Sequence, residues 1–131
     1  MKRLSSLLWI LILMTNTFCQ TNYVDKNLKE VEIKLNKMAP MMIDSLTRLD
    51  SVKAIPNSTL QYNCTLTRSN KEQINVAAFK EIMESLWIKE MKTAPEFKVF
   101  YKNNVKLNYN YYDKKGELVC SIYITPEKYK N

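Results

Sequence analysis

Two stretches in which apolar residues recur at every second position set the strongest limits on what this chain can fold into. The first stretch covers residues 60–67, and the second covers residues 105–111 and 118–124 on either side of a turn at 113–116. Alternation with a period of two is typical of strands that bury one face and expose the other. The sequence therefore predicts a sheet with one apolar face and one polar face.

An amphipathic segment precedes each of these stretches. Apolar residues recur at helical spacing over 24–38, ending at Pro40, and again over 76–93, where Asn75 can cap the helix. Residues 47–55 read as a further strand that forms a hairpin with the first stretch. The order helix, hairpin, helix, hairpin predicts an α+β fold, in which two αββ units form a four-stranded antiparallel sheet with the helices packed on one face.

The N-terminus has the order of a secretory signal peptide. Lys2 and Arg3 precede the apolar run Leu7–Met14, and small polar residues follow it. The run is far shorter than the ~20 residues that span a bilayer. We therefore predict a signal peptide over residues 1–19, cleavage before Gln20, and a single domain over residues 20–131 that is periplasmic or secreted.

Cys19 leaves open a second processing route. Attachment of a lipid to this cysteine would tether the mature protein to a membrane. A lipobox normally has a small residue before the cysteine, whereas Phe18 stands there in this chain. A lipoprotein is therefore the less favoured alternative, and contact with a membrane is expected only if Cys19 is lipidated.

The mature chain keeps two further cysteines, Cys64 and Cys120. In an oxidising compartment an even pair predicts a disulfide. Both cysteines fall on the apolar phase of their strands, and a disulfide needs Cα atoms within about 7 Å. The prediction therefore places the strand over 60–66 beside the strand over 118–124, or diagonally close to it.

Two residue counts exclude whole classes of function. The chain has no histidine, so Ser-His-Asp and Cys-His catalysis and His-ligated zinc are excluded. Gly116 is its only glycine, which excludes glycine-rich phosphate loops. No cofactor, metal site or catalytic residue is predicted.

The basic residues do not indicate a nucleic-acid partner. Residues 20–131 carry 18 Lys and Arg against 13 Asp and Glu, and only Arg48 and Arg68 are arginines. Lysine lacks the planar fork that recognises phosphates and base edges, so this surplus of lysine favours a soluble surface. Export also removes the chain from most nucleic acid.

The polar phase of the predicted strands supplies the candidate binding surface. Amide and phenol side chains would stand together on the face away from the helices: Asn63, Asn108, Asn110, Tyr112 and Tyr123. Such a mixture offers rigid aromatic area with adaptable hydrogen bonding, which suits a protein or a glycan. An ordinary solvated sheet face is the alternative.

The segment over residues 39–52, continuing into the strand over 60–66, resembles a family of small exported bacterial proteins. The shared pattern is P-M-x-x-D-x-x-T-R-x-D-S followed by a Y-x-Y-T-like strand. The resemblance implies an exported single domain and carries no activity. It also implies that Cys64 stands where the family usually has an aromatic residue.

Within that segment, Asp44, Arg48 and Asp50 form the one cluster of opposite charges. We expect a buried structural cluster in which both aspartates hold Arg48 and fix the entry into the first hairpin, because buried charges must be paired. The alternative is a small anion-binding or hydrolytic enzyme that uses these three residues. The sequence as a whole favours a non-enzymatic binding or accessory module that presents its open sheet face to an envelope protein or glycan.

Overall fold

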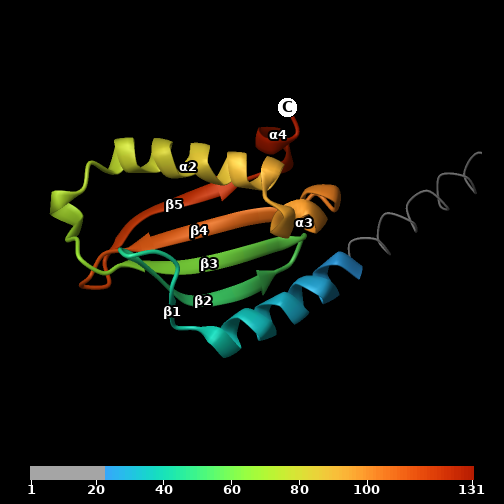
Figure 1. The fold of residues 1–131 in the computed structure, drawn as a ribbon, viewed down its shortest axis with the longest axis horizontal. Helices are drawn as coiled ribbons and strands as arrows, with labels where there is room; N and C mark the ends of the chain where they lie inside the picture. Colours follow the sequence, from blue (N-terminus) through green and yellow to red (C-terminus); the bar gives the residue numbers. More distant parts are fainter. Residues whose placement is uncertain (1–22) are drawn as a thin grey trace, which may run out of the picture.

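Five strands form one mixed sheet in the order β1-β2-β3-β4-β5 (Figure 1). The structure is a computed structural model that describes residues 23–131, so the predicted signal peptide lies outside the described residues. A helix over residues 23–38 precedes the strands. The remaining elements, in chain order, are β1 (Met41–Met42), β2 (Thr47–Ile55), β3 (Thr59–Leu66), η1 (Lys71–Gln73), α2 (Val76–Thr93), η2 (Pro95–Phe97), α3 (Lys98–Lys102), β4 (Lys106–Tyr112), β5 (Leu118–Ile124) and α4 (Pro126–Tyr129).

The predicted α+β class is confirmed, but the predicted antiparallel sheet is wrong. β3 and β4 are adjacent and parallel, whereas the other neighbouring pairs are antiparallel. The connection between β3 and β4 contains α2, and a crossover that carries a helix returns the chain parallel to the first strand. Hydrophobic alternation records which face of a strand is buried and does not record which strand lies beside it.

This strand order also overturns the predicted disulfide. Cys64 pairs with Tyr111, and Tyr111 pairs with Cys120, so one whole strand separates the two cysteines. Two strand spacings correspond to about 9–10 Å, beyond the reach of a disulfide. Both cysteines are free and buried.

The core lies between the apolar face of the sheet and both long helices. Tyr109 on β4 is stacked between Tyr62 on β3 and Trp87 on α2, with ring centroids 4.7 and 4.3 Å away. Trp87 also donates a hydrogen bond to the Tyr111 hydroxyl at 2.8 Å. Leu28, from the helix over residues 23–38, joins the same buried cluster. Both helices therefore cover the same face of the sheet, as predicted.

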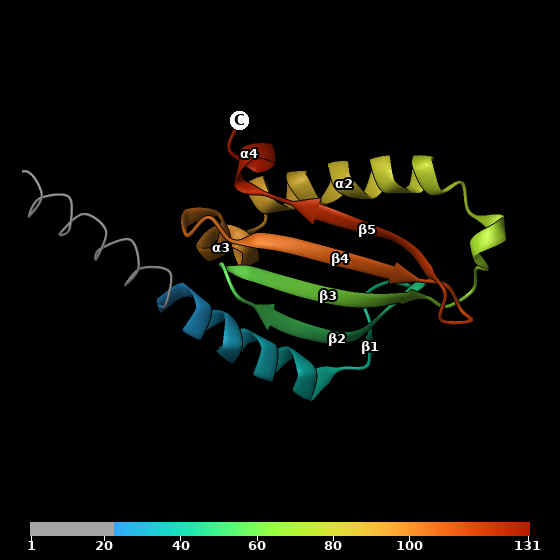
Figure 2. The ribbon, with the colours of Figure 1, turned by 180° about the vertical axis from the view of Figure 1, so that it is seen from behind.

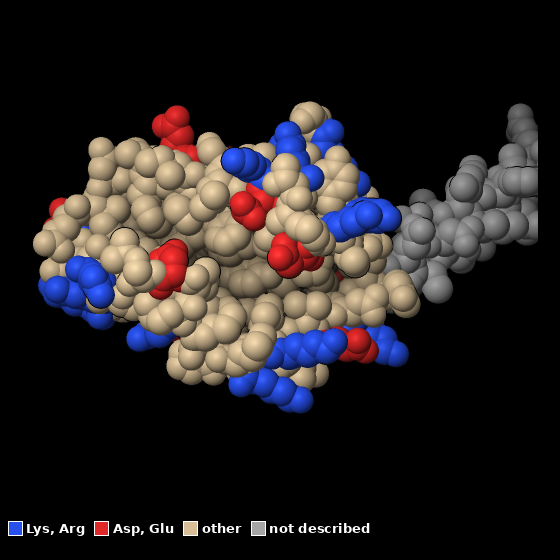
Figure 3. Space-filling view, in the orientation of Figure 1, with Lys and Arg blue, Asp and Glu red and all other residues tan. Residues whose placement is uncertain are grey.

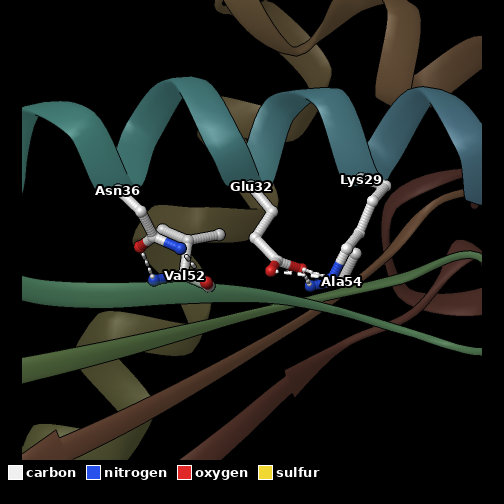
Figure 4. A network of polar contacts seen from close by, with 5 residues as sticks. All are labelled: Lys29, Glu32, Asn36, Val52 and Ala54. Atoms are coloured by element: carbon white, nitrogen blue, oxygen red, sulfur yellow. Dashed lines mark hydrogen bonds and ion pairs between the residues drawn. The ribbon is translucent and has the colours of Figure 1, made fainter.

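The helix over residues 23–38 also closes the outer edge of β2 (Figure 4). The Asn36 side chain accepts a hydrogen bond from the Val52 N–H and donates one to the Val52 carbonyl, both at 2.8 Å. Further along the edge, Glu32 accepts from the Ala54 N–H and Asp25 from the Ser58 N–H. Because an unpaired strand edge invites association, these side chains take the place of a neighbouring strand.

An irregular register between β4 and β5 changes which way Leu118 points. The register shifts between Tyr111 and Tyr112, so Leu118 lies opposite Tyr112 and Val119 joins the core. Such a bulge inserts one extra residue into a strand. The sequence prediction that Leu118 belongs to the apolar face is therefore wrong.

The short C-terminal helix α4 was not predicted from the sequence. Its Tyr129 is fully buried, and the Tyr129 hydroxyl donates a hydrogen bond to the Val105 carbonyl at 2.8 Å. Four residues are too few for helical periodicity to be recognised, so only the proline at its first position marked this helix.

Candidate functional site

Figure 2 shows strands β2 to β5 lying side by side. A row of polar side chains crosses these four strands on the sheet face away from the long helices. Asn63 donates to the Ser51 hydroxyl at 3.0 Å, Asn110 donates to Asn63 at 3.1 Å, and Ser121 donates to Asn110 at 2.7 Å. The structure thus brings together two of the residues predicted for this face. Their mutual hydrogen bonds occupy several of the groups that a ligand would otherwise use.

The other three predicted residues share this face and flank the row. Asn108 pairs with Gln61 on one side and with Tyr123 on the other, and Tyr112 pairs with Thr65. The ring of Tyr123 is 57% exposed, whereas Asn108 is buried. Within the described residues, the side-chain oxygen Oδ1 of Asn108 is buried and has no hydrogen-bond partner. Of the five residues predicted for this face, Tyr123 therefore keeps an exposed side chain and Asn108 keeps an unpaired oxygen.

The three charged residues of the predicted cluster do not form one unit. The Arg48 Nε atom donates to Asp50 at 2.6 Å, and the second oxygen of Asp50 accepts from the Thr65 hydroxyl. Asp44 instead accepts from the Leu46 and Thr47 N–H groups, both at 2.8 Å, and closes the turn into β2. The Arg48 side chain is 44% exposed. The Arg48–Asp50 pair is therefore partly in solvent, whereas the sequence predicted a buried pair.

The hydrogen bonds to Asp44 also set its protonation. Asp44 is exposed, and the bond from the Leu46 N–H, together with the contacts to Thr47, holds the pKa of this carboxyl below its usual value although desolvation acts in the opposite direction. A carboxylate that stays ionised in this way does not serve as a proton donor near neutral pH.

The helical side of the molecule exposes an apolar surface that the sequence analysis did not single out. Figure 3 shows this side hollowed between α2 and the helix over residues 23–38, with a mainly uncharged floor. On α2, Ile82 and Leu86 are 66% and 42% exposed. Glu84, roughly half a turn away around the helix, pairs with Lys128 of α4, so Ile82 and Leu86 face away from α4.

The apolar spacing along α2 was the only available signal for this surface. Ile82 and Leu86 fit the same helical period as the core residues Met83 and Trp87, so periodicity alone assigned all of them to the core. The width of an apolar stripe does not show which of its members the fold will cover.

No group of three or more ligand-type side chains gathers as a metal site anywhere in residues 23–131. Among the same residues, no helix has the length and apolarity needed to cross a bilayer.

Solved structures share this fold at low sequence identity. A Pseudomonas aeruginosa protein described as secreted has a TM-score of 0.68 and 12% identity, covering 83% of this chain and 95% of its own. The type II secretion system pilotin AspS of Vibrio cholerae has a TM-score of 0.67 and 9% identity, covering 86% and 97%. The type II secretion system pilotin EpsS of Vibrio vulnificus has a TM-score of 0.68 and 8% identity, covering 86% and 96%. At such identities the likeness shows the fold alone.

Sequence comparison adds a family. Residues 22–120 match the model of a protein family described as a domain of unknown function. No curated protein sequence matches this chain significantly.

Proposed function

The chain belongs to the DUF8479 family, and we propose that it is an exported, non-enzymatic accessory module that binds a protein partner through its hollowed helical side. One observation carries this proposal: Ile82 and Leu86 stay exposed on α2 and face away from α4. Figure 3 shows the helical side hollowed between the two long helices. Large apolar side chains gathered at a concave surface are typical of protein-binding sites.

The polar contacts around Asp50 support a non-enzymatic role. Both oxygens of Asp50 are engaged, by Arg48 and Thr65, and Asp44 is engaged by two backbone N–H groups. Only the Oδ1 atom of Asp44 accepts these bonds, but they lower the pKa of Asp44, so this carboxyl does not supply the proton donor that the hydrolytic alternative needs. The secreted and pilotin proteins that share the fold are consistent with an accessory role in export or in the cell envelope.

The open sheet face remains a second candidate surface, for a glycan. The exposed Tyr123, next to the row of amide side chains of Asn63 and Asn110, favours it, because aromatic faces and amides together suit hydroxyl-rich ligands.

A pull-down from the native envelope separates the two surfaces. The exported protein is compared with an Ile82→Ser, Leu86→Ser variant and with an Asn110→Ala, Tyr123→Ala variant. We expect the α2 variant to lose a protein partner that the parent and the sheet-face variant retain. Retention of that partner by the α2 variant would exclude the helical side, and loss of glycan material by the sheet-face variant alone would favour the second candidate.

A further inference from the structure

The two edges of the sheet are closed to different degrees. The outer side of β2 carries β1, and its backbone also forms hydrogen bonds to side chains of the helix over residues 23–38. β5 forms the opposite edge, and β4 is its only strand neighbour among residues 23–131. The outer side of β5 is therefore the place where a further strand could join the sheet.

Ser121 and Tyr123 turn their backbone groups toward this outer side. The Lys106 N–H on β4 bonds to the turn before β3, so Asn108, two residues further along, also directs its backbone groups to β3. Tyr123 is the partner of Asn108 on β5, and a pair without mutual hydrogen bonds points its groups outward. The Tyr123 carbonyl accordingly accepts from the Lys128 Nζ atom at 2.7 Å. Backbone directions alternate along a strand, so Ser121 faces outward as well.

Three outward groups of β5 have no hydrogen-bond partner in the described part of the chain. They are the N–H and C=O groups of Ser121 and the N–H group of Tyr123. Edge strands commonly carry a lysine or a proline that discourages pairing, whereas β5 has neither. The bulge beside Tyr112 lies at the start of the strand and Lys128 covers its end, so the stretch between them stays open to a partner.

α2 lies closest to β5 among the strands and runs along the open edge (Figure 1). The side chains on one flank of α2 line an open groove of about 480 Å³: Ala77, Lys80, Glu81, Glu84, Ser85 and Ile88. Glu84 pairs with the Lys128 Nζ atom at 2.8 Å, and the same atom donates to the Tyr123 carbonyl. The groove and the open edge of β5 therefore lie on the same side of the molecule.

The charges of this region balance and favour an uncharged occupant. Two lysines, Lys80 and Lys128, stand beside two glutamates, Glu81 and Glu84, and β5 itself carries no charge. Burying an unpaired charge is costly, so a charged side chain would find no free partner here. Ile88 provides an apolar contact in the same groove.

A second copy of this chain does not fit the open edge. Antiparallel pairing of β5 with its own copy would bring the two strands to ~4.8 Å and both α2 helices to the same face of the joined sheet. Packed helices need ~8–10 Å between their axes. Because α2 lies beside the edge strand rather than over the middle of the sheet, the two helices would overlap. A single extended segment has no covering helix and avoids this clash.

We propose that β5 accepts an uncharged, extended segment of a partner protein as a sixth strand of the sheet. The outward groups of Ser121 and Tyr123 supply its backbone hydrogen bonds, and alternate side chains of the segment enter the groove beside Ile88. Backbone pairing of this kind gives affinity, and the groove gives selectivity for apolar side chains. The proposal goes beyond partner binding at the hollowed helical side and does not rest on it.

Short linear peptides selected from a random display library on the exported protein are the probe. We expect the selected peptides to be uncharged and to carry apolar residues at alternate positions. Isothermal titration calorimetry should show saturable binding of such a peptide to the parent protein. Failure to select a peptide that saturates the protein would overturn the proposal.

Two variants of Ser121 separate its N–H group from its side chain. Ser121→Ala and Ser121→Pro both remove the hydroxyl that donates to Asn110, but only proline also removes the outward N–H. Proline is tolerated in an edge strand where the N–H faces solvent. We expect Ser121→Pro to weaken peptide binding at least about tenfold and Ser121→Ala to leave it nearly unchanged. Equal affinities of the two variants would contradict strand addition.

Peptides methylated at single backbone nitrogens test the same pairing on the parent protein, so this measurement does not depend on how a variant folds. In a strand only every second residue directs its N–H toward a given neighbour. Methylation should therefore weaken binding at alternate positions and leave the positions between them nearly unaffected. An effect that is uniform along the peptide would reject a sixth strand.

Amide hydrogen exchange separates this edge from the helical side. On addition of saturating peptide, exchange of the Ser121 and Tyr123 amide hydrogens should slow at least about tenfold. Ile82→Ser with Leu86→Ser should bind the peptide as the parent does. If that α2 variant loses the peptide while Ser121→Pro retains it, the peptide lies at the helical side. The edge proposal is then wrong, and the proposed function stands.

Discussion

Single carboxylates hold turns through hydrogen bonds: Asp44 holds the turn into β2, and Asp113 holds the turn between β4 and β5. Their charged neighbours contribute less to stability. Arg48 is one such neighbour: it is 44% exposed and pairs with Asp50, which keeps its Thr65 contact without it. We expect Arg48→Ala to lower the free energy of unfolding by no more than ~1 kcal/mol, as for surface ion pairs. Urea denaturation measures this, with Arg68→Ala as the exposed control. A loss near 3 kcal/mol would restore the buried cluster that the sequence suggested.

Asp113 is the residue at which we expect pH to act on stability. Burial raises its pKa, but hydrogen bonds from the N–H groups of Lys71, Glu117 and Lys115 outweigh burial and hold the pKa below its usual value. A lowered pKa in the folded state gives stability that is complete above the unfolded pKa of about 4 and is lost as pH falls through the folded value.

Asp113→Asn tests this pH dependence. Thermal unfolding between about pH 3 and pH 7 should show the variant less stable than the parent at neutral pH and less sensitive to acid, because the group that titrates is gone. Glu117→Gln, at an exposed position of the same turn, is the control. Parallel curves for parent and Asp113→Asn would show that this carboxylate does not govern acid stability.

Among the elements, the helix over residues 23–38 has a double role, since it covers the sheet and closes the edge of β2. Asn36→Ala removes both hydrogen bonds to Val52, a residue that is itself buried. We expect a loss of about 1–3 kcal/mol in the free energy of unfolding, because partners are left unpaired. Amide hydrogen exchange at Val52 should quicken, whereas exposed Asn27→Ala on the same helix should change neither quantity. An unaltered exchange rate at Val52 would mean that the helix does not protect this edge.

The positions of helices and strands along the chain were largely predictable, whereas the pairing of strands in the sheet was not. The strand predicted over residues 47–55 has the bounds observed for β2, and Asn75 caps α2 as expected by accepting from the Ala78 N–H. Local patterns contain this information because burial of one face acts on each segment separately. The parallel pairing of β3 with β4 depends on how the connection through α2 brings two distant segments together. No residue pattern within either strand indicates it.

The candidate surfaces were also predictable only in part. The shared face of Asn63, Asn108, Asn110, Tyr112 and Tyr123 followed from strand phase and agrees with the register. The separation of Asp44 from Arg48 did not follow, because it depends on whether a side chain turns toward its own backbone. Nor did the exposure of Ile82, because it depends on how far apart the two helices lie on the sheet.

At the scale of the whole molecule, the strand order determines the chemistry of the cysteines. β4 stands between Cys64 on β3 and Cys120 on β5, so each thiol is buried beside Tyr111 with no partner in reach. Burial raises the pKa of Cys64 to about 12 and also raises that of Cys120. Since the thiolate is the reactive form, both cysteines should resist alkylation while the domain is folded.

Thiol counting therefore tests the sheet order directly. Mature protein denatured without reductant should give two free thiols from Cys64 and Cys120, located by mass spectrometry after alkylation. In native buffer near pH 8 the same two cysteines should react slowly, at a rate that follows global unfolding, because only opening of the sheet exposes them. A Cys64–Cys120 disulfide in the exported protein would require β3 and β5 to be neighbours, and the parallel pairing of β3 with β4 would then be wrong.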